Sequence, residues 1–260
     1  MAVAIIGGTG FYKMFEGKFI EQEVDTRYGA AVVYQGQDEY DGLFFLPRHG
    51  VDHAIPPHKI NYRANIAALK KLGVERILAT FAVGSINADI EPGYLVALDQ
   101  FLDFTSEREL SFFDGGESGL AHVEVNDPYC KNLRLNLIDH APKHLLTLIS
   151  GGTYVATNGP RFETPAEIKM YAQVGGDVVG MTGVPEVVLA REMEIHYAAV
   201  AHSINWAAGI NPKIEIVREG IEETRRSLLG LFVDVLNQPF LHTCECEDSL
   251  MVSHPPTWQD

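Results

Sequence analysis

The chain has 260 residues, 46% hydrophobic residues and a formal net charge of −15, which predicts an ordinary globular protein and excludes a disordered one. The acidic charge disfavours nucleic acid and anionic membranes as partners, because phosphate backbones are bound by clustered Lys and Arg. The N-terminal segment has no basic region, and no apolar run approaches the ~20 residues of a membrane span, so a cytoplasmic protein is expected.

The first element in chain order is a strand over residues 3–6 that runs into Gly7-Gly8-Thr9-Gly10. The backbone amides of such a turn, with the Thr9 hydroxyl beside them, can bind an anion. The spacing fits neither a dinucleotide fingerprint nor a P-loop. Taken alone, the turn is as consistent with a plain strand end as with a phosphate site.

A second buried strand over residues 43–46 ends at Pro47 and is followed by Arg48, His49 and Gly50. A forked guanidinium and a titratable imidazole suit an oxyanion such as phosphate, and a surface salt bridge is the equal alternative. A metal site built from His49 and the two histidines that follow it is disfavoured, because Pro56-Pro57 prevents a regular helix from aligning the rings.

The middle and end of the chain alternate between strand and helix patterns, as an α/β domain requires. Asp99 and Asp103 are expected to cap turns and to form salt bridges near Arg108 rather than to bind metal. The predicted helices span residues 60–72 and 215–236, and the predicted strands span residues 76–83, 95–98, 153–157 and 197–204.

Polar motifs are concentrated between residues 151 and 209. Thr164-Pro165-Ala166-Glu167 predicts an N-cap, a Pro at the first helical position and a Glu at the third, so Phe162 and Glu163 lie on the loop that opens a helix. The apolar run 177–181 predicts a buried parallel strand that places Met181 and Thr182 at its carboxyl end. Ligands of α/β folds bind at such ends.

The chain contains three cysteines, Cys130, Cys244 and Cys246, which is too few for a secreted disulfide framework. His242, Cys244, Cys246 and His254 could form a zinc site in the tail, but the Cys-x-Cys spacing differs from the usual two-residue gap. A solvated tail without a metal is therefore expected, and a local redox pair is the second interpretation.

Four motifs occur together in one order. They are Gly7-Gly8-Thr9-Gly10, Arg48-His49-Gly50 with Pro56-Pro57 and Asn61-Tyr62-Arg63-Ala64-Asn65, the run 158–164, and Gly180-Met181-Thr182 with Val184-Pro185-Glu186-Val187. This combination closely resembles the purine nucleoside phosphorylase family, in the branch of 5'-methylthioadenosine and S-methyl-5'-thioinosine phosphorylases, over residues 3 to about 236.

The resemblance implies a single three-layer α/β/α domain over residues 1–238, with a mixed sheet that curls toward a barrel and a tail of unknown role at 239–260. It implies a homotrimer or a dimer of trimers with active sites near the subunit interfaces, and no metal or organic cofactor. In the family reaction, which serves purine salvage, inorganic phosphate is a co-substrate that displaces the purine from C1' and leaves a ribose 1-phosphate.

The resemblance also assigns site residues. Thr9, Arg48, His49 and Thr182 match the phosphate donors, Met181 matches the residue under the ribose, and Phe162 matches the aromatic ring on the purine. Glu163 and Asn205 match the base-reading pair and, with His49, are the expected catalytic residues. Phe81 departs from the family pattern, because relatives usually carry a small polar residue there and one donor is lost.

The substrate follows from Asn205 and Ala207, which stand where adenine-accepting relatives carry Asp. An amide can donate to O6 while Glu163 accepts from N1–H, so a 6-oxopurine nucleoside is expected: S-methyl-5'-thioinosine, inosine or guanosine. A 5'-methylthioadenosine phosphorylase is the alternative. A nucleoside hydrolase or a non-catalytic nucleoside sensor is the alternative from another class.

The segment after Asn205 is expected to contact the 5' substituent of the nucleoside. Residues 206–240 contain no His that could bind a 5'-hydroxyl, whereas Ile210, Ile214, Ile216 and Val217 offer an apolar wall. This composition favours a 5'-methylthio group. Glu215 or Glu219 could instead turn inward and bind a hydroxyl.

Overall fold

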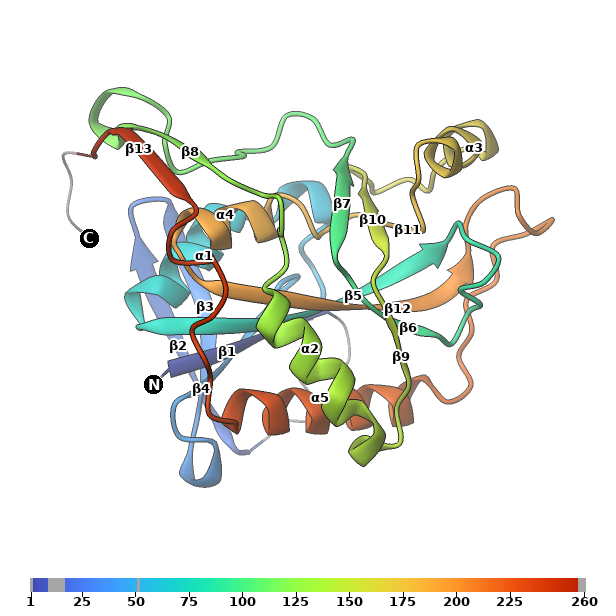
Figure 1. Ribbon diagram of the computed structural model, residues 1–260, viewed down its shortest axis with the longest axis horizontal. Helices are drawn as coiled ribbons and strands as arrows, with labels where there is room; N and C mark the ends of the chain where they lie inside the picture. The colour runs from blue at the N-terminus through green and yellow to red at the C-terminus, as the bar shows by residue number, and fades with distance from the viewer. Residues whose placement is uncertain (1, 9–16, 51, 257–260) are drawn as a thin grey trace.

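The structure is a computed structural model that describes residues 2–8, 17–50 and 52–256. An 11-stranded mixed sheet carries helices on both faces (Figure 1). Its strands are β1 (Ala2–Gly7), β2 (Phe19–Thr26), β3 (Gly29–Gly36), β4 (Leu43–Pro47), β5 (Val74–Ser85), β6 (Leu95–Ala97), β7 (Gln100–Asp103), β9 (Leu148–Ser150), β10 (Thr153–Ala156), β11 (Val178–Gly180) and β12 (His196–Trp206). The helices are α1 (Tyr62–Lys71), α2 (Lys131–His140), α3 (Pro165–Gln173), α4 (Glu186–Glu192) and α5 (Ile221–Asn237).

Strand β1 shows why the domain has three layers. Its side chains alternate, so Val3 and Ile5 join the core that α2 and α5 cover, whereas Ala4 and Ile6 join the core that α1 and α4 cover. A strand buried on both faces is read in the sequence as a continuous apolar run. The expected α/β/α architecture with a mixed sheet is therefore confirmed (Figure 1).

The sheet divides at the end of β5. One edge of β5 pairs with β12 as far as Ser85, while the other pairs first with β1 and then, at Gly84 and Ser85, with β11 in antiparallel orientation. Strands β1, β4, β5 and β12 run parallel, so their carboxyl ends lie at one edge. Strand β11 runs back along the end of β5, which brings Met181 and Thr182 to the same edge.

The predicted helices are present, but one begins later than expected. Helix α5 starts at Ile221 instead of residue 215, because Gly220 takes a left-handed φ of 72° and Val217 N donates to the Ile204 carbonyl at 2.8 Å. Apolar periodicity does not distinguish this loop from a helical turn. The β2–β3 hairpin, β7 and α2 were not predicted from the sequence.

The tail is partly packed rather than solvated. Strand β13 (Leu250–His254) pairs with β8 (Leu120–Val123) in a small second sheet, and Cys246 and Ser249 are buried. The side chain of Cys246 belongs to the core between the sheet and helices α2 and α5. Among the described helices, none has both the length and the apolar character needed to cross a membrane.

Candidate active site

A cavity of about 630 Å³ lies at the carboxyl ends of β4, β5 and β12, beside residues 179–182. Ligands of α/β proteins bind at such edges. Gly8 lines the cavity, whereas the predicted phosphate donor Thr9 lies outside the described residues. The other predicted site residues all line it: Arg48, His49, Phe162, Glu163, Met181, Thr182 and Asn205.

Arg48 is 2% exposed and forms a forked ion pair with Glu186. Its Nε and Nη2 donate to the two carboxylate oxygens at 2.6 and 2.8 Å, and Nη1 donates to the Thr80 carbonyl at 3.2 Å. Tyr197 OH donates to Glu186 Oε1 at 2.6 Å. A guanidinium carries five N–H groups, so two stay available to an anion. The sequence left open a surface salt bridge here, and the structure shows a buried one at a cavity wall.

Phe81 does more than remove a donor from this end of the cavity. Its ring centroid lies 4.8 Å from the Arg48 guanidinium carbon, and it contacts Tyr154 at 5.2 Å between centroids. A cation over an aromatic face is favoured electrostatically, most strongly where water is excluded. Phe81 therefore helps to hold the guanidinium that it lies against.

His49 Nδ1 lies 2.8 Å from the Ile55 carbonyl, an acceptor, so Nδ1 carries the proton. Burial lowers the pKa of His49 to about 4, and the charge of Arg48 acts in the same direction. The imidazole is therefore neutral at pH 7, with its lone pair on Nε2. With Nδ1 bonded to the Ile55 carbonyl, Nε2 is the ring nitrogen that remains for a ligand.

Two contacts fix Met181 and Thr182 at the cavity. The Tyr154 hydroxyl accepts from Thr182 N and Gly183 N at 3.0 and 3.2 Å, so a ligand would meet the Thr182 hydroxyl rather than its amide. Gly159 has a left-handed φ of 61°, and a Cβ there would lie 2.3 Å from Met181 Sδ. Glycine at 159 thus allows the thioether to pack directly on the backbone.

The other end of the cavity carries Phe162, Glu163 and Asn205. Glu163 is 9% exposed and accepts from Thr157 Oγ1 at 2.7 Å through Oε1, so Oε2 is left for a ligand. Asn205 Nδ2 donates to the Trp206 carbonyl at 2.8 Å and retains a second N–H. Phe162 is 53% exposed at the cavity edge.

The loop before α3 has the predicted cap. Thr164 Oγ1 accepts from Glu167 N at 3.2 Å, and a Glu167 carboxylate oxygen accepts from Thr164 N at 2.7 Å. This reciprocal pair fixes the start of the helix. The preceding Glu163 is thereby directed to the cavity.

Arg108 joins three segments of the site and was not recognised from the sequence. Nη2 donates to the carbonyls of Thr157, Asn158 and Met181 at 3.2, 3.1 and 2.8 Å, and Nη1 donates to the Val184 carbonyl. No local sequence pattern marks an Arg that binds distant carbonyls.

The expected salt bridges of Asp99 and Asp103 with Arg108 are wrong, because the cation is already used by the carbonyls of the site. The capping part of that expectation is correct. Asp99 Oδ1 accepts from Gly152 N, and Asp103 Oδ1 accepts from Thr105 N. Both carboxylates therefore stabilise turns.

The apolar wall is only partly as predicted. Ile214 and Ile216 line the cavity, and so do two polar residues that the sequence analysis passed over, His202 of β12 and Arg225 of α5. Burial, and secondarily the charge of Arg225, lowers the pKa of His202 to about 4, so this ring is neutral. His202 precedes Asn205 in β12, whereas the sequence prediction of the 5' pocket rests on the segment that follows Asn205. Glu215 and Glu219 are exposed and, among the described residues, stand outside the cavity lining.

Known proteins share this architecture. The family model described as "Phosphorylase superfamily" matches residues 2–236. A "Probable 6-oxopurine nucleoside phosphorylase" of Dictyoglomus turgidum is 47% identical, over 96% of this chain and 97% of that protein. A "Probable S-methyl-5'-thioinosine phosphorylase" of Methanocaldococcus jannaschii is 46% identical, over 95% and 97%.

A solved structure supports the same assignment. The methylthioadenosine phosphorylase from an antarctic soil metagenomic library matches with a TM-score of 0.85 and 31% identity, over 95% of this chain and 90% of that one. The family model covers most of the chain, and the relatives align over nearly their whole length. The chain therefore belongs to the phosphorylase superfamily, as the order of its motifs predicted.

Proposed function

We propose that this protein is a purine nucleoside phosphorylase that uses inorganic phosphate to cleave 6-oxopurine nucleosides. The observation that carries the proposal is that a single cavity is lined both by Arg48, His49 and Thr182, which suit an oxyanion, and by Glu163 and Asn205, which suit a purine edge. The names of the relatives, 6-oxopurine nucleoside phosphorylase and S-methyl-5'-thioinosine phosphorylase, support it.

In the proposed reaction the co-substrate is the nucleophile. The two remaining N–H groups of Arg48 and the Thr182 hydroxyl bind HPO₄²⁻, and neutral His49 accepts a hydrogen bond from its P–OH through Nε2. A phosphate oxygen forms the bond to C1' as the C1'–N9 bond breaks and its electron pair passes to the purine. The proton of the phosphate ends on the released base.

The remaining side chains stabilise the charges that develop. Met181 excludes water from the cationic ribose, since a thioether is polarisable and apolar. The second N–H of Asn205 meets the negative charge that builds on N7 and O6, while Glu163 accepts from N1–H. Adenine has no proton on N1 and presents a donor at C6, so both contacts would be unfavourable.

A substrate panel tests this proposal. Inosine, guanosine, adenosine and the 5'-methylthio forms of inosine and adenosine are each assayed with and without phosphate. We expect phosphate-dependent release of hypoxanthine or guanine. Base release without phosphate would identify a hydrolase, and nucleoside binding without turnover at any phosphate concentration would identify a sensor.

The 5' substituent gives a graded prediction. Burying a methyl group and a sulfur against Ile214 and Ile216 favours methylthioinosine over inosine by about 1–3 kcal/mol, so inosine is expected to be a slower substrate.

We expect His202→Ala to reduce kcat/KM for inosine alone, because His202 is a neutral polar group that lines the cavity and is available to a hydroxyl. Ile216→Ser is the matched control and should reduce kcat/KM for methylthioinosine alone. Equal constants for both nucleosides in the wild type would contradict the apolar-wall argument.

Arg108 is proposed as a positioning residue. Arg108→Lys keeps the charge but cannot reach the carbonyls of Asn158, Met181 and Val184 together, so we expect the free energy of unfolding to fall by about 2–4 kcal/mol. Because these carbonyls belong to the nucleoside end, KM for the nucleoside should rise more than KM for phosphate. Urea unfolding and steady-state kinetics measure the two effects.

Arg63, a partly buried arginine whose acidic partners are exposed, provides the control for that substitution. Arg63 pairs with the exposed carboxylates of Glu109 and Asp114. Exposed pairs contribute at most about 1 kcal/mol, so Arg63→Lys should leave both Michaelis constants unchanged. If Arg108→Lys altered the two constants in equal proportion, a positioning role at the nucleoside end would be ruled out.

We further propose a homotrimer or a dimer of trimers, with a neighbouring subunit beside the cavity. The exposed ring of Phe162 supports this, because a large aromatic side chain at a cavity edge is typical of a surface that is covered on assembly. Light scattering on the purified protein gives the oligomeric mass. A monomer with full activity would exclude a required partner subunit.

A further inference from the structure

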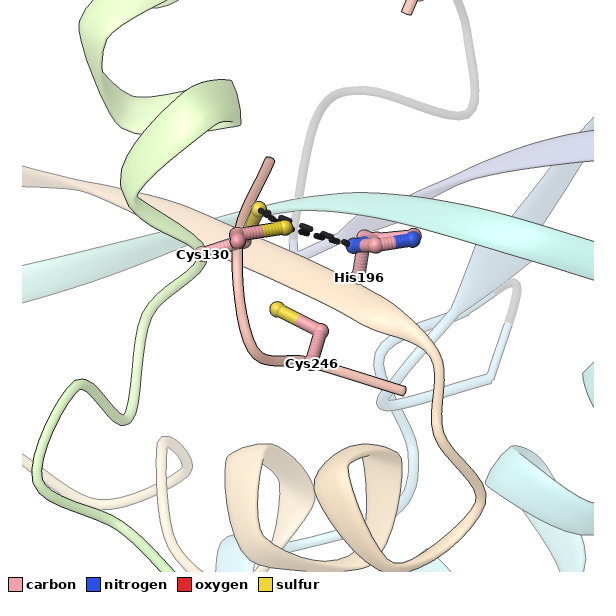
Figure 2. Close-up of side chains that lie close together, drawn as sticks. Cys130, His196 and Cys246 are labelled. Atoms are coloured by element: carbon pink, nitrogen blue, oxygen red, sulfur yellow. Dashed lines mark hydrogen bonds between the residues drawn. The ribbon is translucent and has the colours of Figure 1, made fainter. Parts of the chain in front are cut away.

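Four potential metal ligands converge at the end of the domain where β12 begins. Cys130 immediately precedes α2, His196 opens β12, and Cys244 and Cys246 belong to the tail after α5. Figure 2 shows the side chains of Cys130, His196 and Cys246 gathered from these separate segments. The ligand atoms of all four residues lie within 4.8 Å of one another, and three of the four residues are buried.

The distances among Cys130, Cys244 and His196 are close to the edges of a tetrahedron around zinc. With Zn–S of about 2.3 Å and Zn–N of about 2.0–2.1 Å, ligand atoms are separated by roughly 3.8 Å for two sulfurs and 3.6 Å for sulfur and nitrogen. Cys130 Sγ lies 3.6 Å from Cys244 Sγ. His196 Nδ1 lies 3.8 Å from Cys130 Sγ and 3.3 Å from Cys244 Sγ.

The surroundings orient the histidine as a metal site requires. His196 Nε2 lies 3.2 Å from Glu247 Oε1, an acceptor, so Nε2 carries a proton and Nδ1 faces the sulfur atoms. Metal-binding histidines usually donate their other N–H in this way. The backbone adds a further constraint, because Cys130 N donates to the Tyr197 carbonyl at 2.7 Å and keeps the thiol beside His196.

A buried cation, Arg191, lies near Cys246. Arg191 is 4% exposed, and within the described part of the chain its Nε has no hydrogen-bond acceptor. Three thiolates around Zn²⁺ carry a net charge of −1, which such a buried cation offsets.

We propose that Cys130, His196, Cys244 and Cys246 bind one zinc ion. With four protein ligands the coordination is closed, so the site is structural rather than catalytic. It differs from the tail cluster considered from sequence, because Cys130 and His196 take the places of His242 and His254, and it replaces the expectation of a metal-free protein. Asn205 follows His196 by nine positions in β12, roughly 30 Å along the strand, so the ion lies far from the nucleoside cavity.

Zinc at this position joins the tail to the domain. Its ligands come from the residue before α2, the start of β12 and the tail, three segments that one ion would join. Binding energy at a structural zinc site adds to the stability of the folded state. We therefore expect chelation to release the tail and lower the Tm without altering the ligands of the active site.

The test uses the full chain, purified without an affinity tag under reducing conditions with zinc supplied. Elemental analysis should give about one zinc per chain. Exchange for Co²⁺ should give the intense visible bands and the thiolate-to-metal absorption of a tetrahedral cobalt site. Cys246→Ser and His196→Ala should lower the zinc content to background, whereas the matched control His242→Ala should retain about one zinc per chain.

Three results would overturn the proposal. The first is reduced wild-type protein that binds neither zinc nor cobalt, a measurement that does not depend on whether the variants fold. The second is a Cys130–Cys244 disulfide in the purified protein, seen as linked peptides after digestion without reductant. Retention of zinc by both Cys246→Ser and His196→Ala would likewise exclude these residues as ligands.

Discussion

Arg48→Ala is expected to reduce kcat/KM by about 10²-fold or more, because the substitution removes an anion donor from a site with little water. The main change should appear in the saturation curve for phosphate. Since Arg48 is also the partner of buried Glu186, the free energy of unfolding should fall by about 3–5 kcal/mol, the usual result of leaving a buried charge unpaired. Initial rates at varied phosphate and urea unfolding measure the two effects.

A double variant separates the loss of activity from the loss of stability. Arg48→Ala combined with Glu186→Gln removes the unpaired carboxylate, so much of the lost stability should return while activity stays low. Tyr197 can still donate to the amide oxygen at position 186, which keeps that hydrogen bond satisfied. Near-normal activity in folded Arg48→Ala protein would show that phosphate binds elsewhere.

Asn205→Asp is expected to move base preference from 6-oxopurines toward 6-aminopurines. The amide N–H that would meet O6 and N7 is replaced by a carboxylate, which repels those acceptors and can accept from the amino group of adenine. The mismatch leaves buried polar groups unpaired, so the ratio of kcat/KM for methylthioinosine to that for methylthioadenosine should fall by ~10²-fold or more. Both nucleosides are assayed at saturating phosphate.

The contacts of Asn205 and its neighbour Ala207 suggest control variants for the change in base preference. A carboxylate at 205 would also face the Trp206 carbonyl, which now accepts from Asn205 Nδ2, so some activity should be lost toward every base. Asn205→Ala should lose activity and weaken the 6-oxopurine preference without reversing it, because Glu163 still accepts from N1–H. Adding Ala207→Asp to Asn205→Asp should strengthen the preference for adenine, because Ala207 lines the same cavity. Faster turnover of methylthioadenosine than methylthioinosine by the wild type would overturn the 6-oxopurine assignment.

Much of the fold could be predicted locally. Strands β1 and β4 appear in the sequence as uninterrupted apolar runs because both of their faces are buried, and the start of α3 is specified by residues 164–167. Helix α5 was extended too far toward its amino end, because the apolar spacing continues through the cavity-lining loop. The β2–β3 hairpin alternates between exposed and buried positions and went unrecognised.

Some residues of the candidate site could likewise be predicted from the sequence, and others could not. Arg48, His49, Met181 and Thr182 could be chosen because each follows a strand end, where parallel strands deliver side chains to one edge. Arg108 and His202 could not be chosen. Their positions depend on which carbonyls and which cavity wall lie beside them, and these come from residues distant in the chain.

The sequence by itself determined the α/β class, the family resemblance and most residues around the cavity, because strand burial and helix caps depend on neighbours in the chain. Only the tertiary structure decided the partners: Glu186 for Arg48, the Ile55 carbonyl for His49, and Cys130 with His196 for the tail cysteines. These contacts determine the charge balance around Arg48, the protonation of His49 and the capacity of the cysteines to bind a metal. They arise from contacts between segments that are far apart in sequence, which local patterns do not encode.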